Sequence, residues 1–364
     1  MKSIFGARPD HYQRLNLTEG AIELWENGLR TDAGEGSFEW WYFDCHLDDG
    51  SKFTIEFHTK PPYLSPSQPL TPFVSLILDR PDGTQIQKTY ITTPDAFKAS
   101  QERCDVVIGG NTFEGDLRTH RIHVEIDELV MDVTLNAEVP SWRPATGHMF
   151  FGDDEQYYLA WLPVVPRAAV AVTLTIDGNR EQLQGTGYHD HNWGNIALRK
   201  IIDHWYWGRA HVKDYTVIAV MLVSGEMYGK QEFPLFMLAR SGEILASAMG
   251  VEHIACTATE LRLNEQTGVP VANHLVYDIQ QMDSRYTASF VRQKDVFMFD
   301  FGRAGAYHRF VGDVTLEHHV NGRLIETVSE DARWELLYFG ARACSPAKEL
   351  SPHRQSAPIL VHQV

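Results

Sequence analysis

The feature that most constrains the fold is a long succession of short β-like runs, each ended by a turn signal. About twenty runs rich in Val, Ile, Thr and aromatic residues follow one another, separated by turns such as D-D-G at 48–50, P-D-G at 81–83 and D-G-N at 177–179. Only 94–100 and 196–202 suggest brief helical segments. This pattern predicts an all-β chain built largely of antiparallel hairpins.

A chain of 364 residues is long for one hydrophobic core, because typical domains span ~100–200 residues. Two tandem barrels of roughly eight to ten strands each would absorb the runs without exposed edges, and such a barrel can hold one small ligand. We therefore expect an irregular lead-in, an N-terminal barrel, a C-terminal barrel and a polar tail, at 1–36, 37–195, 196–343 and 344–364. Five prolines within 61–72 predict a flap over one end of a barrel.

The charge balance and the cysteines disfavour several classes of protein. Acidic residues outnumber basic ones by 48 to 32, and the net charge of −16 argues against a nucleic-acid partner. Four widely spaced cysteines form no C-x-x-C pair, which is typical of reduced, buried thiols: Cys45, Cys104, Cys256 and Cys344. No run approaches the ~18 apolar residues that a membrane span needs, and the N-terminus lacks the apolar core of a signal peptide. We expect a cytoplasmic monomer or homodimer without a membrane span.

Two aromatic hairpins flank the middle of the chain. The first joins 37–47 to 51–60 through the D-D-G turn and carries E-W-W-Y-F-D at 39–44. Strand alternation divides these side chains between two faces: Glu39, Trp41 and Phe43 on one, and Trp40, Tyr42 and Asp44 on the other. The second hairpin joins 203–212, which contains W-Y-W-G-R, to 215–223 through Lys213 and Asp214.

Between these hairpins lies the richest polar stretch of the chain, G-T-G-Y-H-D-H-N-W-G-N at 185–195. We interpret it as the boundary between two β-domains and as one wall of a ligand pocket. An extended backbone here would again divide the side chains between two faces: His189, His191 and Trp193 on one, and Tyr188, Asp190 and Asn192 on the other.

The histidines of this stretch could bind a metal. A His-x-His pair on a strand offers two imidazoles to one ion. The related pattern of the cupins needs a Glu soon after the second His, however, and N-I-A-L occupies 195–198. We find no other His, Glu or Cys cluster at a matching spacing and expect no metal; a metal-dependent enzyme using His189 and His191 is kept as an alternative.

Acid–base chemistry on a bound organic molecule is the second interpretation. Burial among aromatic rings raises the pKa of a carboxyl group, which can then protonate a double bond or polarise a carbonyl near neutral pH. Asp190 between two histidines fits this role, as do Glu39 and Asp44. A third, purely structural interpretation is a hydrogen-bonded corner at the end of a strand.

Other chemistries lack their motifs. The sequence contains no G-x-S-x-G elbow, and none of its cysteines stands in a His/Asn context. It also contains neither G-x-G-x-x-G nor G-x-x-x-x-G-K-[ST], so we expect no nucleotide cofactor.

Three strings together resemble a known family: E-W-W-Y-F-D at 39–44, G-Y-H-D-H-N-W-G at 187–194 and W-Y-W-G-R at 205–209. In order and rough spacing they are similar to the AttH-like, carotenoid 1,2-hydratase (hydroxyneurosporene synthase) superfamily over 36–340. The resemblance implies two tandem lipocalin-like β-barrels with a pocket at or near their junction. It also implies a cofactor-independent enzyme for apolar, unsaturated natural products: a carotenoid or kievitone-type hydratase, or a lipocalin-like Diels–Alderase.

The resemblance also assigns residues. The His-x-Trp pair of the hydratases matches His191 and Trp193, whereas their Tyr-x-Asp pair has no counterpart between 195 and 270. The expected proton donor is therefore missing or has moved, with Asp190 as the candidate, which weakens hydration and leaves room for cyclisation. Together with the acid–base interpretation of the polar stretch, the resemblance gives the expected catalytic residues Tyr188, His189, Asp190, His191 and Trp193. The expected substrate-binding residues are Glu39, Trp41, Tyr42, Asp44, Trp205, Tyr206, Trp207 and Arg209.

Each version of the reaction uses these residues differently. In a cyclase, the pocket holds diene and dienophile in a reactive geometry, and Tyr42, Tyr188 or Arg209 hydrogen-bonds the acceptor carbonyl. In a hydratase, Asp190 protonates the alkene and His191 activates water, while Trp193 and Trp207 shield the cation. We therefore expect a lyase or an isomerase acting on a polyene, polyketide or terpenoid. A non-catalytic carrier of an apolar metabolite is the alternative.

Overall fold

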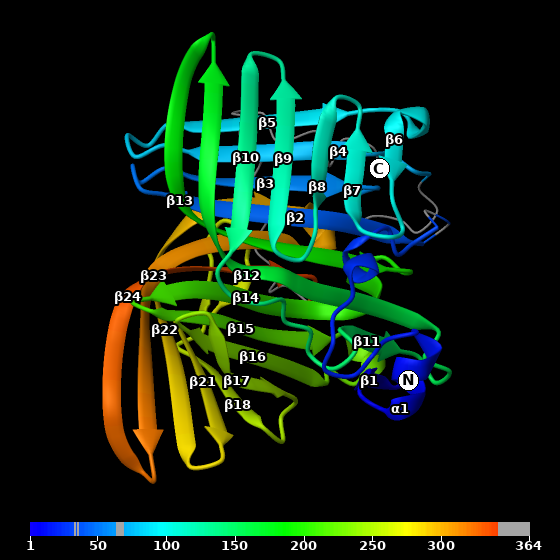
Figure 1. The fold of residues 1–364 in the computed structure, drawn as a ribbon. Coiled ribbons are helices and arrows are strands. Elements are labelled where there is room, and N and C mark those ends of the chain that lie inside the picture. Colours follow the sequence, from blue (N-terminus) through cyan, green and yellow to red (C-terminus); the bar gives the residue numbers. More distant parts are fainter. Residues whose placement is uncertain (33, 35, 63–68, 341–364) are drawn as a thin grey trace. The chain divides into compact units, whose positions relative to one another are not determined.

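The computed structural model describes residues 1–32, 34, 36–62 and 69–340. Strands dominate it, and the prediction of an all-β chain is confirmed (Figure 1). The described residues form two compact units, one made of 6–150 and 154–198, the other of 1–5, 151–153 and 199–340. Residues 63–68, which belong to the predicted flap, and the tail from 344 lie outside the described residues.

The N-terminal unit is built on one long antiparallel sheet with the strand order β5-β4-β3-β2-β13-β12-β10-β9-β8-β7-β6. Its strands are β2 (Phe38–Leu47), β3 (Lys52–His58), β4 (Phe73–Asp79), β5 (Gln85–Ile91), β6 (Phe97–Ala99), β7 (Cys104–Ile108), β8 (Asn111–Gly115), β9 (Thr119–Ile126), β10 (Leu129–Ala137), β12 (Tyr157–Ile176) and β13 (Asn179–Gly194). A further strand, β11 (His148–Phe151), pairs with β12.

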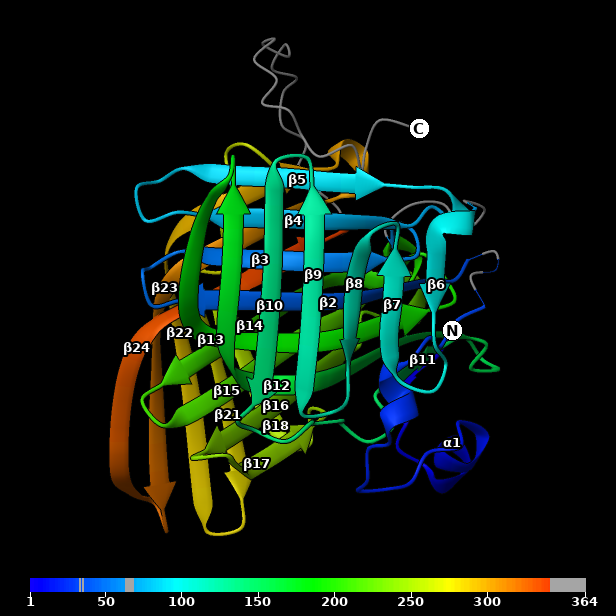
Figure 2. The same cartoon turned by 45° about the horizontal axis from the view of Figure 1, so that its top comes forward.

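This sheet curls over itself, so that β2–β5 run across β7–β10 (Figure 2). Apolar side chains of the two arms meet in one core, where the Phe57 ring of β3 packs edge-on against the Phe113 ring of β8 at 5.7 Å. In the described part of the sheet the outermost strands are β5 and β6, at opposite ends of the strand order. The predicted barrel is therefore a curled sheet, and its two end strands do not pair with each other in the described part of the chain.

The lead-in contains more structure than its irregular sequence suggests. It holds the short helix α1 (Pro9–Arg14) and the 3₁₀ turn η1 (Leu24–Asn27). Residues 24–29 are tied to the rest of the N-terminal unit by a buried ion pair between Glu26 and Arg143 and by the Leu29 N–H, which donates to the Ser100 carbonyl at 2.7 Å. Backbone and side-chain groups of 26–31 are thereby held beside β2 and β13.

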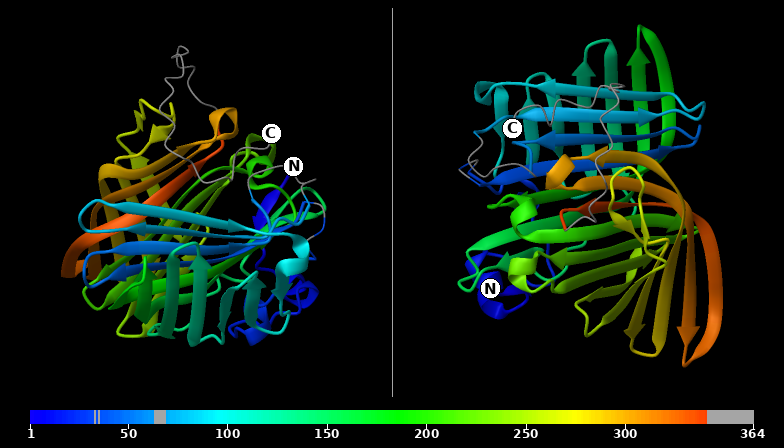
Figure 3. Two further views of the ribbon diagram at one scale, coloured as in Figure 1. Left: turned by 90° about the horizontal axis from the view of Figure 1, so that it is seen from above. Right: turned by 180° about the vertical axis from the view of Figure 1, so that it is seen from behind.

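The C-terminal unit has a second antiparallel sheet with the order β17-β16-β15-β14-β24-β23-β22-β21-β18. Its strands are β14 (Ile202–Val212), β15 (Tyr215–Ser224), β16 (Glu232–Arg240), β17 (Glu243–Met249), β18 (Ile254–Thr259), β21 (His274–Gln281), β22 (Ser284–Asp300), β23 (Ala306–Val320) and β24 (Arg323–Tyr338). The long strands β23 and β24, orange in Figure 3, bend strongly around a core that includes Phe290, Phe310 and Trp334.

Smaller elements complete the two units. β1 (Ser3–Phe5) belongs to the C-terminal unit, in which β19 (Arg262–Leu263) and β20 (Pro270–Val271) form a separate pair. The remaining 3₁₀ turns are η2 (Pro94–Ala96), η3 (Leu198–Lys200), η4 (Glu226–Tyr228) and η5 (Gly302–Ala304). Of the predicted helical segments, 94–100 contains the 3₁₀ turn η2 followed by the strand β6, and 196–202 contains only the 3₁₀ turn η3 before β14 begins. Among the described residues, no helix has the length and apolar character needed to cross a membrane.

Candidate functional site

Strand pairing brings two of the sequence motifs together. β13 is hydrogen-bonded to β2 so that Asp190 lies opposite Tyr42, and Trp193 opposite Glu39. On its other side, β13 pairs with β12, where Asn192 lies opposite Trp161. The polar stretch therefore occupies the C-terminal part of a central strand that is paired on both edges, and its backbone is extended through Gly194.

The predicted alternation of side chains is present and gives the two faces of β13 different partners. Trp193 of β13 and Trp41 and Phe43 of β2 belong to the core of the N-terminal unit, and His191 stacks on Trp41 with ring centroids 4.7 Å apart. Tyr188, Asp190 and Asn192 lie on the opposite face. Asp190 therefore does not share a surface with the two histidines beside it.

On the core face, His191 and Glu39 form a fully buried pair, both 0% exposed, with Nε2 2.7 Å from Oε1. The Glu39 carboxylate also accepts from the Arg30 N–H at 2.7 Å and from the Thr31 N–H and hydroxyl, each at 2.8 Å. The other ring nitrogen of His191 lies 3.2 Å from the Glu26 carbonyl oxygen. Both ring nitrogens of His191 thus face hydrogen-bond acceptors, one in the Glu39 carboxylate and one in the backbone.

His189 has a different environment on the same face. Its Nδ1 donates to the Tyr42 carbonyl at 2.8 Å, and its Nε2 lies 3.0 Å from Nδ2 of Asn27. Nε2 of His120, on β9, lies 3.1 Å from the same nitrogen. Burial lowers the pKa of His120 to about 4 and that of His189 well below its usual value, so both rings are neutral.

On the opposite face, Asp190 accepts at least three hydrogen bonds. The Trp161 indole N–H and the Tyr188 hydroxyl donate to Oδ2, both at 2.8 Å, and the Asn192 amide donates to Oδ1 at 2.7 Å. Donors on both oxygens stabilise an ionised carboxylate. Burial is the main cause that raises the pKa of Tyr188 well above its usual value, and Asp190 adds to it, so the phenol remains protonated.

A second carboxylate lies on this face in the neighbouring strand. The Tyr42 hydroxyl donates to Oδ2 of Asp44 at 3.2 Å, and the Tyr42 ring meets the Tyr188 ring edge-on with centroids 6.2 Å apart. Since Tyr188 lies opposite Asp44 in the strand register, the face presents two phenols beside two carboxylates.

The predicted residues of β14 are divided by the same strand geometry. Tyr206 belongs to the core of the C-terminal unit, and its hydroxyl accepts from the Ala272 N–H at 2.9 Å. Trp205, Trp207 and Arg209 alternate with it and lie on the opposite face; Trp205 donates to Oε1 of Glu335 at 3.1 Å. Tyr206 is therefore a core residue and does not share a surface with the other three.

A narrow space on the C-terminal sheet is lined mainly by aromatic residues, among them Tyr277, Phe290 and Trp334, and it has no room for a water molecule. Pockets for drug-sized ligands span roughly 300–1,000 Å³, so this space is too small for a polyene.

Several residues that hold these groups are absent from the predicted set. Trp161 donates to Asp190, Thr31 to Glu39, and Asn27 contacts two histidines. None stands in a motif, because each comes from a separate segment of the chain. On the C-terminal sheet, Arg309 donates to the Tyr307 hydroxyl at 2.6 Å, and that hydroxyl donates to Glu335 beside Trp205.

The family model described as Diels-Alderase-like matches residues 32–256. The chain belongs to this family, and the predicted resemblance is confirmed.

Three curated relatives are similar in sequence. The quinolone epoxide rearrangement protein penF of Penicillium thymicola is 31% identical over 83 residues, 23% of this chain and 22% of that protein. Hydroxyneurosporene dehydrogenase of Chlorobaculum tepidum is 29% identical over 230 residues, 54% of this chain and 58% of that protein. The quinolone epoxide rearrangement protein asqO of Emericella nidulans is 24% identical and covers 73% of this chain and 76% of that protein. The chain thus spans less than two thirds of the first two.

Solved structures share the fold. CghA superposes with a TM-score of 0.61 at 16% identity, covering 84% of this chain and 89% of CghA. A structure from Nitrosomonas europaea named for AttH gives 0.62 at 15% identity, covering 89% and 98% of the two chains. Kievitone hydratase from Nectria haematococca gives 0.54 at 15% identity, covering 88% and 93%.

Proposed function

We propose that this chain is an enzyme that cyclises or rearranges a hydrophobic, unsaturated small molecule without a bound cofactor. Family membership supports this proposal, as do two relatives named for the rearrangement of quinolone epoxides. Hydration of a double bond is the related reaction that the kievitone hydratase fold brings into consideration.

The hydrogen bonds at Asp190 are the observation that favours cyclisation or rearrangement over hydration. A carboxylate that accepts from Trp161, Tyr188 and Asn192 is held as an anion. Such a group stabilises positive charge that develops on a polarised double bond or an opening epoxide, and the indole of Trp161 adds its π face. Cyclisation and rearrangement give an isomer of the substrate, so they need this electrostatic help and a folded substrate but no net addition of water.

The same contacts disfavour hydration. An alkene hydratase needs an acid to protonate carbon and a base to activate water. Asp190 already accepts donors on both oxygens, and His191 lies between the Glu39 carboxylate and the Glu26 carbonyl. We assign His191 and Glu39 to positioning β13, and Tyr42, Asp44, Tyr188, Asp190 and Asn192 to contact with the substrate.

The test is conversion of a substrate panel by the full chain: a quinolone epoxide, hydroxyneurosporene and a linear polyene that carries a dienophile. We expect an isomer of unchanged mass from at least one compound, and a fall in kcat/KM of roughly 10²–10³-fold for Asp190→Asn, the usual cost of losing one stabilising group. Glu181→Gln is the matched control, because it removes a carboxylate from an exposed part of the same strand.

Three results would overturn parts of this assignment. A product heavier by one water would establish hydration. Binding of these compounds without any change would establish a carrier. Wild-type rates for Asp190→Asn would remove Asp190 from the mechanism. The pocket at the junction of two barrels, the cytoplasmic location and the monomeric or homodimeric state stay predictions.

A further inference from the structure

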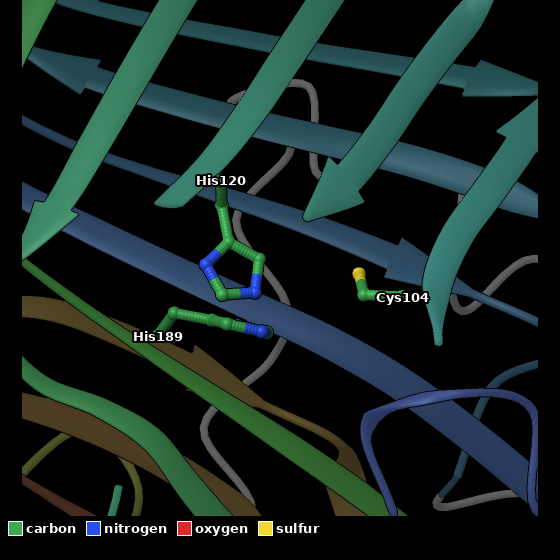
Figure 4. A group of neighbouring side chains, drawn as sticks. All are labelled: Cys104, His120 and His189. Atoms are coloured by element: carbon green, nitrogen blue, oxygen red, sulfur yellow. The ribbon is translucent and has the colours of Figure 1, made fainter. Parts of the chain in front are cut away.

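Three metal-binding side chains converge inside the N-terminal unit, away from the face that carries Asp190. Cys104 of β7, His120 of β9 and His189 of β13 point toward one another (Figure 4). Their potential ligand atoms all lie within 4.8 Å of one another, and the residues are 1%, 0% and 0% exposed. The chain thus collects two imidazoles and a thiol at one buried point.

The hydrogen bonds of His189 direct the lone pair of one ring nitrogen toward the cluster, where the Asn27 amide nitrogen lies 3.0 Å from it. Its Nδ1–H donates to the Tyr42 carbonyl at 2.8 Å, so the lone pair of the neutral ring is on Nε2, toward the cluster. Metal-ligating histidines usually donate their other N–H to a carbonyl in this way, which fixes the tautomer and the ring orientation.

Asn27 provides the second, independent observation. Its side-chain nitrogen lies 3.1 Å from Nε2 of His120 and 3.0 Å from Nε2 of His189. Its Oδ1 is buried without a hydrogen-bond partner among the described residues, and so is Nδ1 of His120. Since the oxygen and nitrogen of an amide exchange places by a simple flip, Asn27 can direct an oxygen at the point where both imidazole lone pairs converge.

We propose that Cys104, His120, His189 and Asn27 bind a transition-metal ion of the zinc type. A tetrahedral ion with sulfur, imidazole and oxygen ligands matches this donor set. Binding would bring the ligand atoms to about 2.0–2.3 Å from the ion and release the Cys104 thiol proton to solvent. With four protein ligands the site is closed, so the ion links β7, β9 and β13 to η1 and does not react with substrate.

Metal binding by the purified full-length chain tests the proposal, independently of any catalysis. After treatment with a chelator, the protein is titrated with Zn²⁺ and with Co²⁺. We expect about one ion per chain, with a thiolate-to-cobalt absorption band and the visible bands of tetrahedral cobalt. We also expect Zn²⁺ to raise the unfolding temperature.

Variants locate the site. Cys104→Ser abolishes the thiolate band, and Asn27→Ala and His120→Gln weaken Co²⁺ binding by roughly tenfold or more. Cys256→Ser, a free thiol in the other unit, is the matched control and leaves the band unchanged. Absence of any band or Zn²⁺ stabilisation in wild type overturns the proposal, as does unchanged binding in Cys104→Ser and His120→Gln. If Cys104→Ser does not fold, His120→Gln and Asn27→Ala decide the question.

Discussion

At the scale of single residues, this protein buries charged and polar side chains in pairs that satisfy one another. Glu39 and His191 are both inaccessible to solvent, and four donors surround the carboxylate. A buried pair of this kind adds little net stability relative to apolar residues, but removing one partner leaves the other unpaired in a medium that cannot solvate it. The pair therefore fixes where β13 lies relative to β2 and the lead-in.

Glu39→Gln tests this role of the buried pair. The substitution keeps the shape of the side chain and removes the charge opposite His191, so we expect a loss of about 3–5 kcal/mol in the free energy of unfolding. Glu138→Gln breaks only the exposed ion pair with Arg167 and costs less than about 1 kcal/mol. Denaturant titration of both variants measures the difference in their free energies of unfolding. Equal losses would show that the buried pair contributes no more to stability than the exposed pair.

At the scale of elements, the glycines in the polar stretch serve close strand packing. They flank H-D-H-N-W in the sequence as turn residues would, yet β13 runs through them without interruption. A Cβ atom on Gly185 would lie 2.1 Å from the His46 carbonyl oxygen of the paired strand β2, well inside contact distance. The absence of a side chain lets β2 approach and keeps the two motifs in register.

Gly185→Ala is therefore expected to destabilise the chain by roughly 1–3 kcal/mol, because a clash with backbone is relieved only by moving a strand. Gly110→Ala is the control, since a Cβ there meets no atom within 4 Å. It should be neutral or stabilising by up to about 1 kcal/mol through the unfolded state. The midpoint of guanidinium unfolding compares them, and a neutral Gly185→Ala would contradict the packing argument.

At the scale of the whole molecule, buried neutral histidines couple stability to pH. His148 is buried in the N-terminal unit, and burial lowers its pKa from 6.5 to about 4. Between these values the unfolded chain binds a proton that the folded chain does not, so stability falls as the pH falls from about 6.5 to about 4. The full shift corresponds to about 3 kcal/mol.

His148→Gln should flatten this dependence. The glutamine does not titrate, so the unfolding free energy of the variant should lose about 3 kcal/mol less than that of wild type between pH 7 and pH 4. Thermal unfolding across this pH range, followed for both proteins, measures the slope. His123→Gln is the comparison, because that side chain is partly exposed and bonded to Asp132. Parallel curves for wild type and His148→Gln would contradict the assignment.

The local pattern of the chain determined the secondary structure and the faces of its strands. Turn residues and β-branched runs specify hairpins through short-range sterics, and alternation separates His191 from Asp190 without knowledge of the fold. The motif strings also identified the family. The limits of two barrel domains remain predictions, and so does the set of catalytic residues.

Only the tertiary structure decided which distant groups meet. Asn27, Cys104 and His120 come from three separate segments, and Trp161 reaches Asp190 because β12 pairs with β13. Strand order and register depend on packing of the whole sheet, and no local spacing encodes them. Strand alternation alone places Tyr206 on the face opposite Trp205 and Trp207. Which of the two faces is buried depends on the position of the core, and only the tertiary structure determines that position.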